Sequence, residues 1–296
     1  MATKLIRFDW AMKKILRNKA NYGILEGFLS ELLRFDVTIE NILESEGNKD
    51  TYYDKSNRVD ILVRSTKGEL MLVEVQNDSE ADYFHRMLYG VSTLATEYIN
   101  EGEPYGTIRK IYSINIVYFG LGQGEDYVYE YRGDFVGIHK NDILLPTPYQ
   151  KKKYSADKVA DIFPKYYILK VNNFDEVAKN TLDEWIYFLK NSEVKDEFKA
   201  KGLSQAKEKL RYEQLSEKEK KKYKEAQKVQ LIAKSVEETR IGEAKLEGEL
   251  RGREEGEKLA KIETVKNAIH MNLDDEAIQK LTGLSLEEIK QLRKNN

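Results

Sequence analysis

The sequence has no cysteine, and only four prolines and three histidines among its 296 residues. The lack of cysteine excludes disulfides, thiolate catalysis and cysteine metal sites, and it fits the reducing cytoplasm, where we expect the protein to act. No apolar run approaches the roughly 20 residues of a membrane span, and the N-terminus lacks the apolar stretch of a secretory signal. We therefore expect no membrane partner.

An excess of charge of one sign is also missing, because the net charge is −2 and the sequence pI is about 6.1. Proteins that bind nucleic acid strongly and without specificity carry a basic excess, so any contact with DNA must be local. Two lysine-rich clusters, at 151–153 and 218–222, are the candidates for such a contact. A solvated charged face is the other interpretation of both.

Charged residues make up 34% of the chain, against about 25% in an average globular protein, and they concentrate in its last third. We therefore predict a globular domain over 1–193, a charged helical linker that contains glycine over 194–260, and a small helical module over 261–296. The linker has glycine at 242, 248, 252 and 256, and each costs a helix about 1 kcal/mol relative to alanine. Such a linker is marginal alone, so self-association through the C-terminal helical region is one expectation.

The last module has the outline of two helices joined by a glycine turn. The pair Asp274-Asp275 is placed to cap the first helix, Thr282-Gly283 to end it in a turn, and 285–288 to form a capping box at the second. A helix-turn-helix that reads DNA has the same outline. Because glutamates at the start of the second helix would face phosphates, we favour an interaction or dimerisation module.

The most informative stretch is 59–76, where acidic side chains interrupt apolar runs. The runs 59–63 and 70–75 flank a turn-forming segment at 65–68, which predicts a β-hairpin. Strand alternation places Glu74 and Gln76 on one face, with Asp60 nearly opposite Glu74. Like charges in that position destabilise a sheet unless a cation lies between them, and Mg²⁺ favours carboxylate oxygens. The alternative is a hairpin whose polar face meets solvent.

Several fragments of the chain, taken in order, resemble the PD-(D/E)XK nuclease superfamily, and more narrowly its Rpn-like family of recombination-promoting nucleases and putative transposases. The matching residues are Phe8-Asp9, Met12-Lys13-Lys14-Ile15-Leu16, Lys55 through Asp60-Ile61, Gly68, Val73-Glu74-Val75-Gln76, Phe84, Arg86, Tyr89 and the helix start at Leu182-Asp183-Glu184-Trp185. The resemblance implies an α/β, restriction-endonuclease-like core with a mixed central sheet flanked by helices. The charge-rich helical extension follows this core.

The resemblance also implies a catalytic site. Asp60 and Glu74 would hold Mg²⁺ or another divalent cation, with the carbonyl oxygen of Val75 as a further ligand. Gln76 stands where the superfamily usually has lysine, as it also does in the Rpn-like family. A glutamine amide orients water but carries no charge, so turnover is less secure than metal binding.

Further residues are weaker candidates. The resemblance makes Glu26, in the first core helix, a possible accessory acid, with Glu31 behind it and an ordinary glutamate at the edge of the apolar stripe as the alternative. Asp9 matches an acidic position of the family, although helix capping explains it equally well. Arg86 is a candidate for contact with phosphate, and a surface ion pair with Asp82, one helical turn earlier, is its alternative.

Together these features predict a metal-dependent DNA endonuclease that hydrolyses phosphodiester bonds and is associated with recombination or mobile DNA. One alternative is a catalytically weak or inactive nuclease fold that binds nucleic acid or a partner. Another is a scaffold whose helical tail does the main work.

Overall fold

The computed structural model describes residues 5–14, 16–43, 61–99 and 103–294. The chain divides into two compact units, Met1–Glu217 and Lys218–Asn296. The first unit thus extends beyond residue 193, where the composition begins to change. Within the described residues, no helix is both long enough and apolar enough to cross a bilayer.

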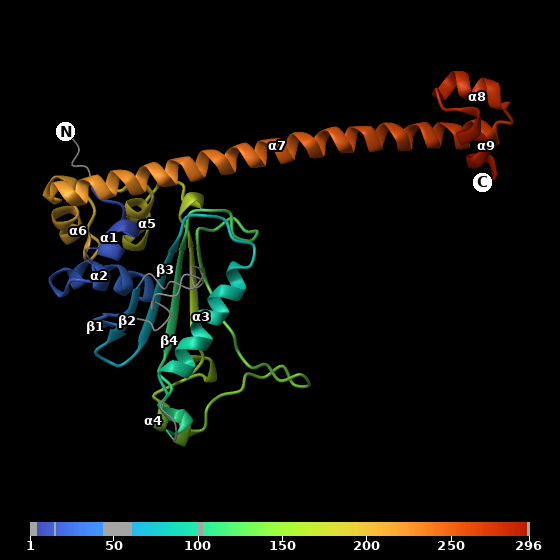
Figure 1. Ribbon diagram of the computed structural model, residues 1–296. Helices are drawn as coiled ribbons and strands as arrows, with labels where there is room; N and C mark the ends of the chain where they lie inside the picture. The colour runs from blue at the N-terminus through green and yellow to red at the C-terminus, as the bar shows by residue number, and fades with distance from the viewer. Residues whose placement is uncertain (1–4, 15, 44–60, 100–102, 295–296) are drawn as a thin grey trace. The chain divides into compact units, whose positions relative to one another are not determined.

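A six-stranded mixed sheet forms the centre of the first unit in its described part (Figure 1). Its spatial order is β1-β2-β3-β4-β6-β5. β3, β4 and β6 are parallel, and the remaining neighbours are antiparallel. The bounds are β1 Ile39–Leu43, β2 Ile61–Ser65, β3 Leu70–Gln76, β4 Ile111–Val117, β5 Val128–Glu130 and β6 Lys165–Lys170.

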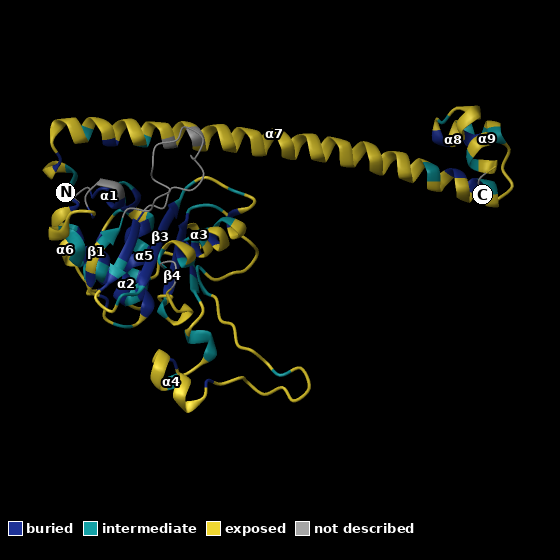
Figure 2. Ribbon diagram, turned by 60° about the horizontal axis from the view of Figure 1, so that its bottom comes forward, coloured by how far each residue is buried: buried dark blue, intermediate teal, exposed yellow. Residues whose placement is uncertain are grey.

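The two central strands are almost wholly buried, because helices cover the sheet on both faces (Figure 2). Every residue of β4 is buried, and β3 is buried from Leu70 to Val75. Parallel strands covered on both faces are built from near-continuous apolar runs. A polar residue inside such a strand therefore needs a partner, which makes it informative.

Helix α3, Tyr83–Glu97, covers one face of the sheet. Its buried residues recur every three to four positions, which gives one apolar stripe. Val91 and Leu94 of that stripe pack with Leu72 of β3 and Ile111 of β4. Each fully buried leucine of this kind contributes roughly 1.5–3 kcal/mol.

The other face is covered by α1 (Phe8–Lys14), α2 (Tyr22–Leu33) and α5 (Thr181–Asn191) (Figures 1 and 2). An aromatic cluster of Phe8, Phe28, Trp185 and Phe188 joins the three helices. These helices come from opposite ends of the first unit's sequence, so their packing ties residues before the sheet to residues after it.

The remaining elements of the first unit are short. Helix α6, which packs on α2, belongs to this unit although its composition resembles that of the tail. The bounds are η1 Lys19–Asn21, η3 Tyr105–Thr107, α4 Pro148–Tyr154, η4 Val159–Asp161, η5 Val171–Asn173, α6 Leu203–Lys209 and η6 Tyr212–Gln214.

The second unit contains most of α7 (Glu217–His270), followed by α8 (Asp275–Thr282) and α9 (Leu286–Lys294). α7 continues through all four glycines of the predicted linker. At its end, Val265, Ala268, Ile278 and Ile289 form a small core.

The caps of the last two helices are those predicted from the sequence. Asp274 accepts a hydrogen bond from the amide of Ala277, and Gly283 has a left-handed backbone. Ser285 and Glu288 exchange the bonds of a capping box.

The sheet order and the helices on both of its faces confirm the expected α/β architecture, with a mixed sheet, flanking helices and a helical C-terminal extension.

Candidate active site

Glu74 is a buried carboxylate in the middle of the sheet, and its side chain retains 8% exposure. It shares a strand face with Leu72 and Gln76. Because Leu72 packs against α3, Glu74 points toward the same helix. The sequence prediction that Glu74 and Gln76 share one face agrees with this arrangement.

The pairing of β2 with β3 can be followed up to the residue next to Asp60. Ile61 of β2 lies opposite Val73 of β3, and Leu62 lies opposite Leu72. Asp60 lies outside the described residues, so its position opposite Glu74 stays a prediction. Gly68, with φ of +80°, occupies the turn, where a left-handed backbone favours glycine.

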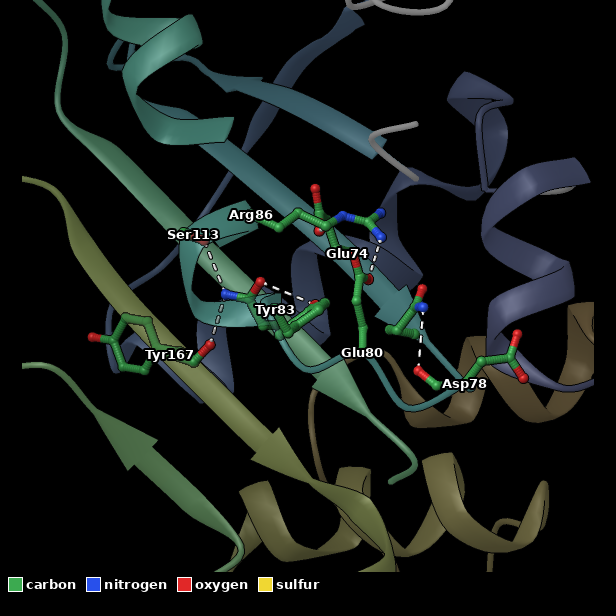
Figure 3. A network of polar contacts seen from close by, with 9 residues as sticks. Glu74, Asp78, Glu80, Tyr83, Arg86, Ser113 and Tyr167 are labelled. Atoms are coloured by element: carbon green, nitrogen blue, oxygen red, sulfur yellow. Dashed lines mark hydrogen bonds and ion pairs between the residues drawn. The ribbon is translucent and has the colours of Figure 1, made fainter. Parts of the chain in front are cut away.

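Arg86 of α3 is the cation beside Glu74 (Figure 3). Its Nε lies 3.6 Å from Glu74 Oε2, and its Nη1 donates a hydrogen bond of 2.9 Å to Glu80 Oε2. Burial alone would lower the pKa of Arg86, but the charges of Glu74 and Glu80 outweigh it and raise the pKa. The alternative partner Asp82 is therefore wrong, because Glu80, in the segment before α3, and Glu74 on the sheet are the acids that Arg86 meets.

A second polar group lies beside Glu74, on the neighbouring strand. Asn115 of β4 is the register partner of Glu74 and is almost fully buried. It accepts a hydrogen bond from the Tyr83 hydroxyl and donates to Ser113 Oγ and to the carbonyl oxygen of Tyr167 (Figure 3). These bonds satisfy the amide and fix it between α3 and β6, which is what a buried polar side chain requires.

Asn115 and Glu80 lie at the candidate site but were not predicted from the sequence. Asn115 stands between Ile114 and Ile116, the same interruption of an apolar run that marked Glu74. That signal was present and could have been used. Glu80 gave no such signal, because it lies in a polar segment typical of a helix N-terminus.

Gln76 ends β3 and is partly exposed. Its Nε2 donates a hydrogen bond of 3.2 Å to the carbonyl oxygen of Asp78. This bond holds the amide at the end of the strand, on the face that carries Glu74. Its carbonyl oxygen is the end of the amide that would accept a hydrogen bond from water.

Asp9 lies close to the same end of β3. Its Oδ2 accepts a hydrogen bond of 3.3 Å from Asn77 Nδ2, and its Oδ1 accepts one of 3.2 Å from Arg7 Nε. Arg7 also donates to Asn77 Oδ1, which closes a network around the residue after Gln76. Asp9 thus borders the strand end, and its role as an accessory acid stays a prediction.

Glu26 has a structural task. Its Oε1 accepts a hydrogen bond of 2.8 Å from the amide of Ile39, at the start of β1. Glu26 belongs to α2, which lies on one side of the sheet. Glu74 points toward α3, which lies on the other side. Glu26 and Glu74 therefore belong to elements on different sides of the sheet, and the role of Glu26 as an accessory acid stays a prediction.

Residues 6–143 match a family model described as PD-(D/E)XK nuclease family transposase. The match covers 138 of the 296 residues, and this segment is similar to that family. The resemblance drawn from the sequence is thereby confirmed, and the mixed sheet with flanking helices is consistent with the PD-(D/E)XK fold. Searches of curated proteins and of solved structures found no match.

The matched segment contains all of the candidate residues, from Asp9 to Asn115. It ends before α4, β6 and α5, which complete the sheet and its second helical layer. The family match therefore rests on the part of the fold that carries the site.

The oxygen donors of the candidate site are of the kind that Mg²⁺ binds. A carboxylate from Glu74 and a backbone carbonyl from Val75 are hard ligands, and Mg²⁺ commonly takes one or two carboxylates with water and substrate phosphate. Among the described residues, no three histidine, aspartate or glutamate side chains gather into a metal cluster. The donor set fits a divalent cation if Asp60 supplies the second carboxylate.

Proposed function

We propose that this protein is a metal-dependent DNA endonuclease that hydrolyses phosphodiester bonds in the cytoplasm, in association with recombination or mobile DNA. The observation that carries the proposal is Glu74, a carboxylate buried in the central sheet of a segment that is similar to a nuclease family. A buried carboxylate is costly unless a cation accompanies it; Arg86 lies beside Glu74 in this structure, and a divalent cation would take over that role in the active protein. PD-(D/E)XK nucleases generally use divalent cations.

Asp60, Glu74 and the carbonyl oxygen of Val75 would hold Mg²⁺ or another divalent cation. When bound, such an ion lowers the pKa of a water ligand and neutralises charge on the phosphate. Gln76 would orient the attacking water through its amide oxygen. Its bond to Asp78 supports that task, because it fixes which end of the amide remains available.

Arg86 would bind the substrate phosphate. Glu80 and Glu74, which now lie beside its guanidinium, determine how many of its donors are available. The guanidinium carries five donors, of which the bond to Glu80 uses one. A divalent cation at Glu74 would replace Arg86 as the compensating charge. Arg86 would then be available to a phosphate oxygen while Glu80 keeps it in place.

A nicking assay on supercoiled plasmid tests this function. We expect the full chain to nick DNA in MgCl₂ and to lose activity in EDTA, and we expect Asp60→Asn and Glu74→Gln each to remove it. Glu40→Gln is the matched control, because Glu40 is an exposed acid of β1. Metal-independent nicking, or activity that survives Glu74→Gln, would contradict the proposal.

A second candidate function is nucleic-acid or partner binding by a nuclease fold with little or no turnover. Gln76 favours it, because an amide cannot supply the positive charge of the usual lysine. Salt-sensitive DNA binding without nicking in any divalent metal would select this candidate.

We also propose that the C-terminal helical region self-associates. Its long helix exposes apolar side chains that include Val229, Ile232, Val236, Leu246 and Leu250. An isolated helix with this surface is marginal in water, and a second copy would bury it. Sedimentation equilibrium of the full chain should show a species larger than the monomer, whereas a monomer at micromolar concentration would refute this.

A further inference from the structure

A second candidate site lies at the end of the sheet where the parallel strands β3, β4 and β6 begin, opposite the end at which Gln76 lies. A pocket of about 800 Å³ opens there. It is separated from Glu74 by most of the length of β3, which is roughly 16 Å at 3.3 Å per residue. Its walls are residues 67–69, 105–110, 153–156 and 161–165, together with Tyr112.

The charge lining this pocket is predominantly positive. Its five cationic residues are Lys67, Arg109, Lys110, Lys153 and Lys165, and its two acids are Glu69 and Asp161. Both acids are engaged. Glu69 accepts hydrogen bonds from Ser65 and Tyr112, and Asp161 accepts one from the amide of Lys158.

Most of the cations are not neutralised by an acid. Lys165 lies 3.5 Å from Glu130, outside the pocket wall. Within the described part of the chain, the other four form no ion pair. Lys153 belongs to the lysine-rich cluster at 151–153 that the sequence offers as a phosphate contact. An anion in this pocket would meet more positive than negative side chains in a partly enclosed space.

Lys110 is the most constrained of these cations. Its Nζ donates hydrogen bonds to the carbonyl oxygens of Asp161, at 2.6 Å, and Phe163. An ammonium group has three donors, so one remains for a ligand. Burial and the charge of Lys165 lower the pKa of Lys110 to about 8, against the opposing charges of Asp161 and Glu69. A bound anion would relieve the repulsion between the two lysines.

Aromatic rings flank the cations. Tyr105 of η3 has 86% of its surface exposed, and Tyr154 and Phe163 are also exposed at the pocket. The ammonium of Lys153 lies 5.4 Å from the centre of the Tyr154 ring. Exposed rings beside cations are the combination that binds a base and its phosphate, because stacking holds the base and charge holds the phosphate.

We propose that this pocket binds a nucleotide, with the phosphate among Lys110, Lys153 and Lys165 and the base against Tyr105 or Tyr154. The volume is within the range of small-molecule sites, about 300–1,000 Å³. The nucleotide is either free or the phosphorylated end of a nucleic-acid strand, and both sources present the same chemistry. The site is independent of the proposed nuclease centre at Glu74.

Titration calorimetry with the full chain tests the proposal. The probes are deoxyadenosine monophosphate, deoxyadenosine, inorganic phosphate, and a short single strand with or without a 5′-phosphate. We expect the monophosphate or the phosphorylated strand to bind at least tenfold more tightly than deoxyadenosine, because the nucleoside lacks the group that the lysines hold. Binding of the monophosphate identifies a free nucleotide, and binding of the phosphorylated strand alone identifies a strand end.

Variants locate the binding. Lys110→Met, Lys153→Gln and Tyr105→Ala should each weaken it about tenfold, whereas Lys140→Gln, at an exposed lysine outside the pocket, should not. Lys153→Gln and Tyr105→Ala change exposed side chains, so they decide the matter if Lys110→Met does not fold. No saturable binding of any phosphorylated probe, or binding that survives both lysine substitutions, overturns the proposal.

Proton uptake gives an independent measure. The groups that face Lys110 are Lys165, Asp161, Glu69 and Tyr112, and burial raises the pKa of Tyr112 so that it stays neutral. An anion favours the ammonium form, so binding at pH 8 should take up a fraction of a proton and weaken as pH rises further. Lys110→Met should abolish this uptake while Mg²⁺-dependent nicking continues, and Glu74→Gln should leave nucleotide binding unchanged.

Discussion

Removal of the Arg86 guanidinium should destabilise the protein, because it leaves the carboxylate of Glu74 inside the sheet without its neighbouring cation. The two side chains are 17% and 8% exposed, and their charged atoms lie 3.6 Å apart. Removal of one partner of a buried ion pair typically costs 3–5 kcal/mol. For Arg86→Met, we expect a loss of about 3 kcal/mol in the free energy of unfolding, since Glu74 keeps other polar surroundings.

Urea denaturation of the full chain at pH 7 measures this loss. Arg132→Met is the matched control, because Arg132 also pairs with a glutamate, at 2.9 Å, but is 79% exposed. An exposed pair contributes at most about 1 kcal/mol. Glu74→Gln added to Arg86→Met should recover most of the stability, because it removes the buried negative charge that Arg86 no longer accompanies.

Divalent metal extends the same test. If Glu74 binds Mg²⁺, the ion should stabilise Arg86→Met more than the unaltered protein, since no cation competes with it there. A site at 100 times its Kd adds about 2.7 kcal/mol. The reasoning is refuted if Arg86→Met is no less stable than Arg132→Met, or if the double variant is as unstable as the single one.

Two further predictions concern the packing of α2 and the ion pairs of β5. Gly27→Ala should destabilise by about 1–3 kcal/mol in urea, because its Cβ would lie 2.2 Å from the carbonyl oxygen of Lys201, whereas Gly242→Ala, with open space around it, should be neutral or stabilising. Burial alone would raise the pKa of Glu130. The hydrogen bond to Arg132 and the charge of Lys165 outweigh burial, so the pKa lies below the ordinary 4.5. The stability that Glu130 adds should therefore be present above about pH 4.5 and be lost as pH falls, so that the difference in unfolding free energy from Glu130→Gln shrinks in acid; a difference that grows in acid would contradict this.

Local chemistry allowed two features to be predicted from the sequence: the hairpin, and the strand face that Glu74 and Gln76 share. Two apolar runs around a glycine turn predict paired strands, and alternation then places Glu74 and Gln76 together. The same local logic predicted the caps at Asp274 and Ser285. Each inference depends on residues within a few positions of each other, where backbone geometry alone sets the relation.

Partners distant in sequence could not be assigned in this way. β6 lies between β4 and β5 in the sheet, and that order places the carbonyl oxygen of Tyr167 beside Asn115. Arg86 was matched with Asp82 by helical spacing, yet it meets Glu74 because α3 packs on β3. Glu26 was a candidate because the resemblance implies an acid from the first core helix, and only the packing showed that its Oε1 accepts a hydrogen bond from the amide of Ile39.

The sequence by itself therefore determined the elements, the acid-bearing strand and the family resemblance, because side-chain alternation and turn chemistry are local. Only the tertiary structure decided which charge compensates Glu74, which amide lies beside it, and which lysines share a pocket at the far end of the sheet. Those relations depend on how helices and strands pack, and packing joins residues that no spacing along the chain connects.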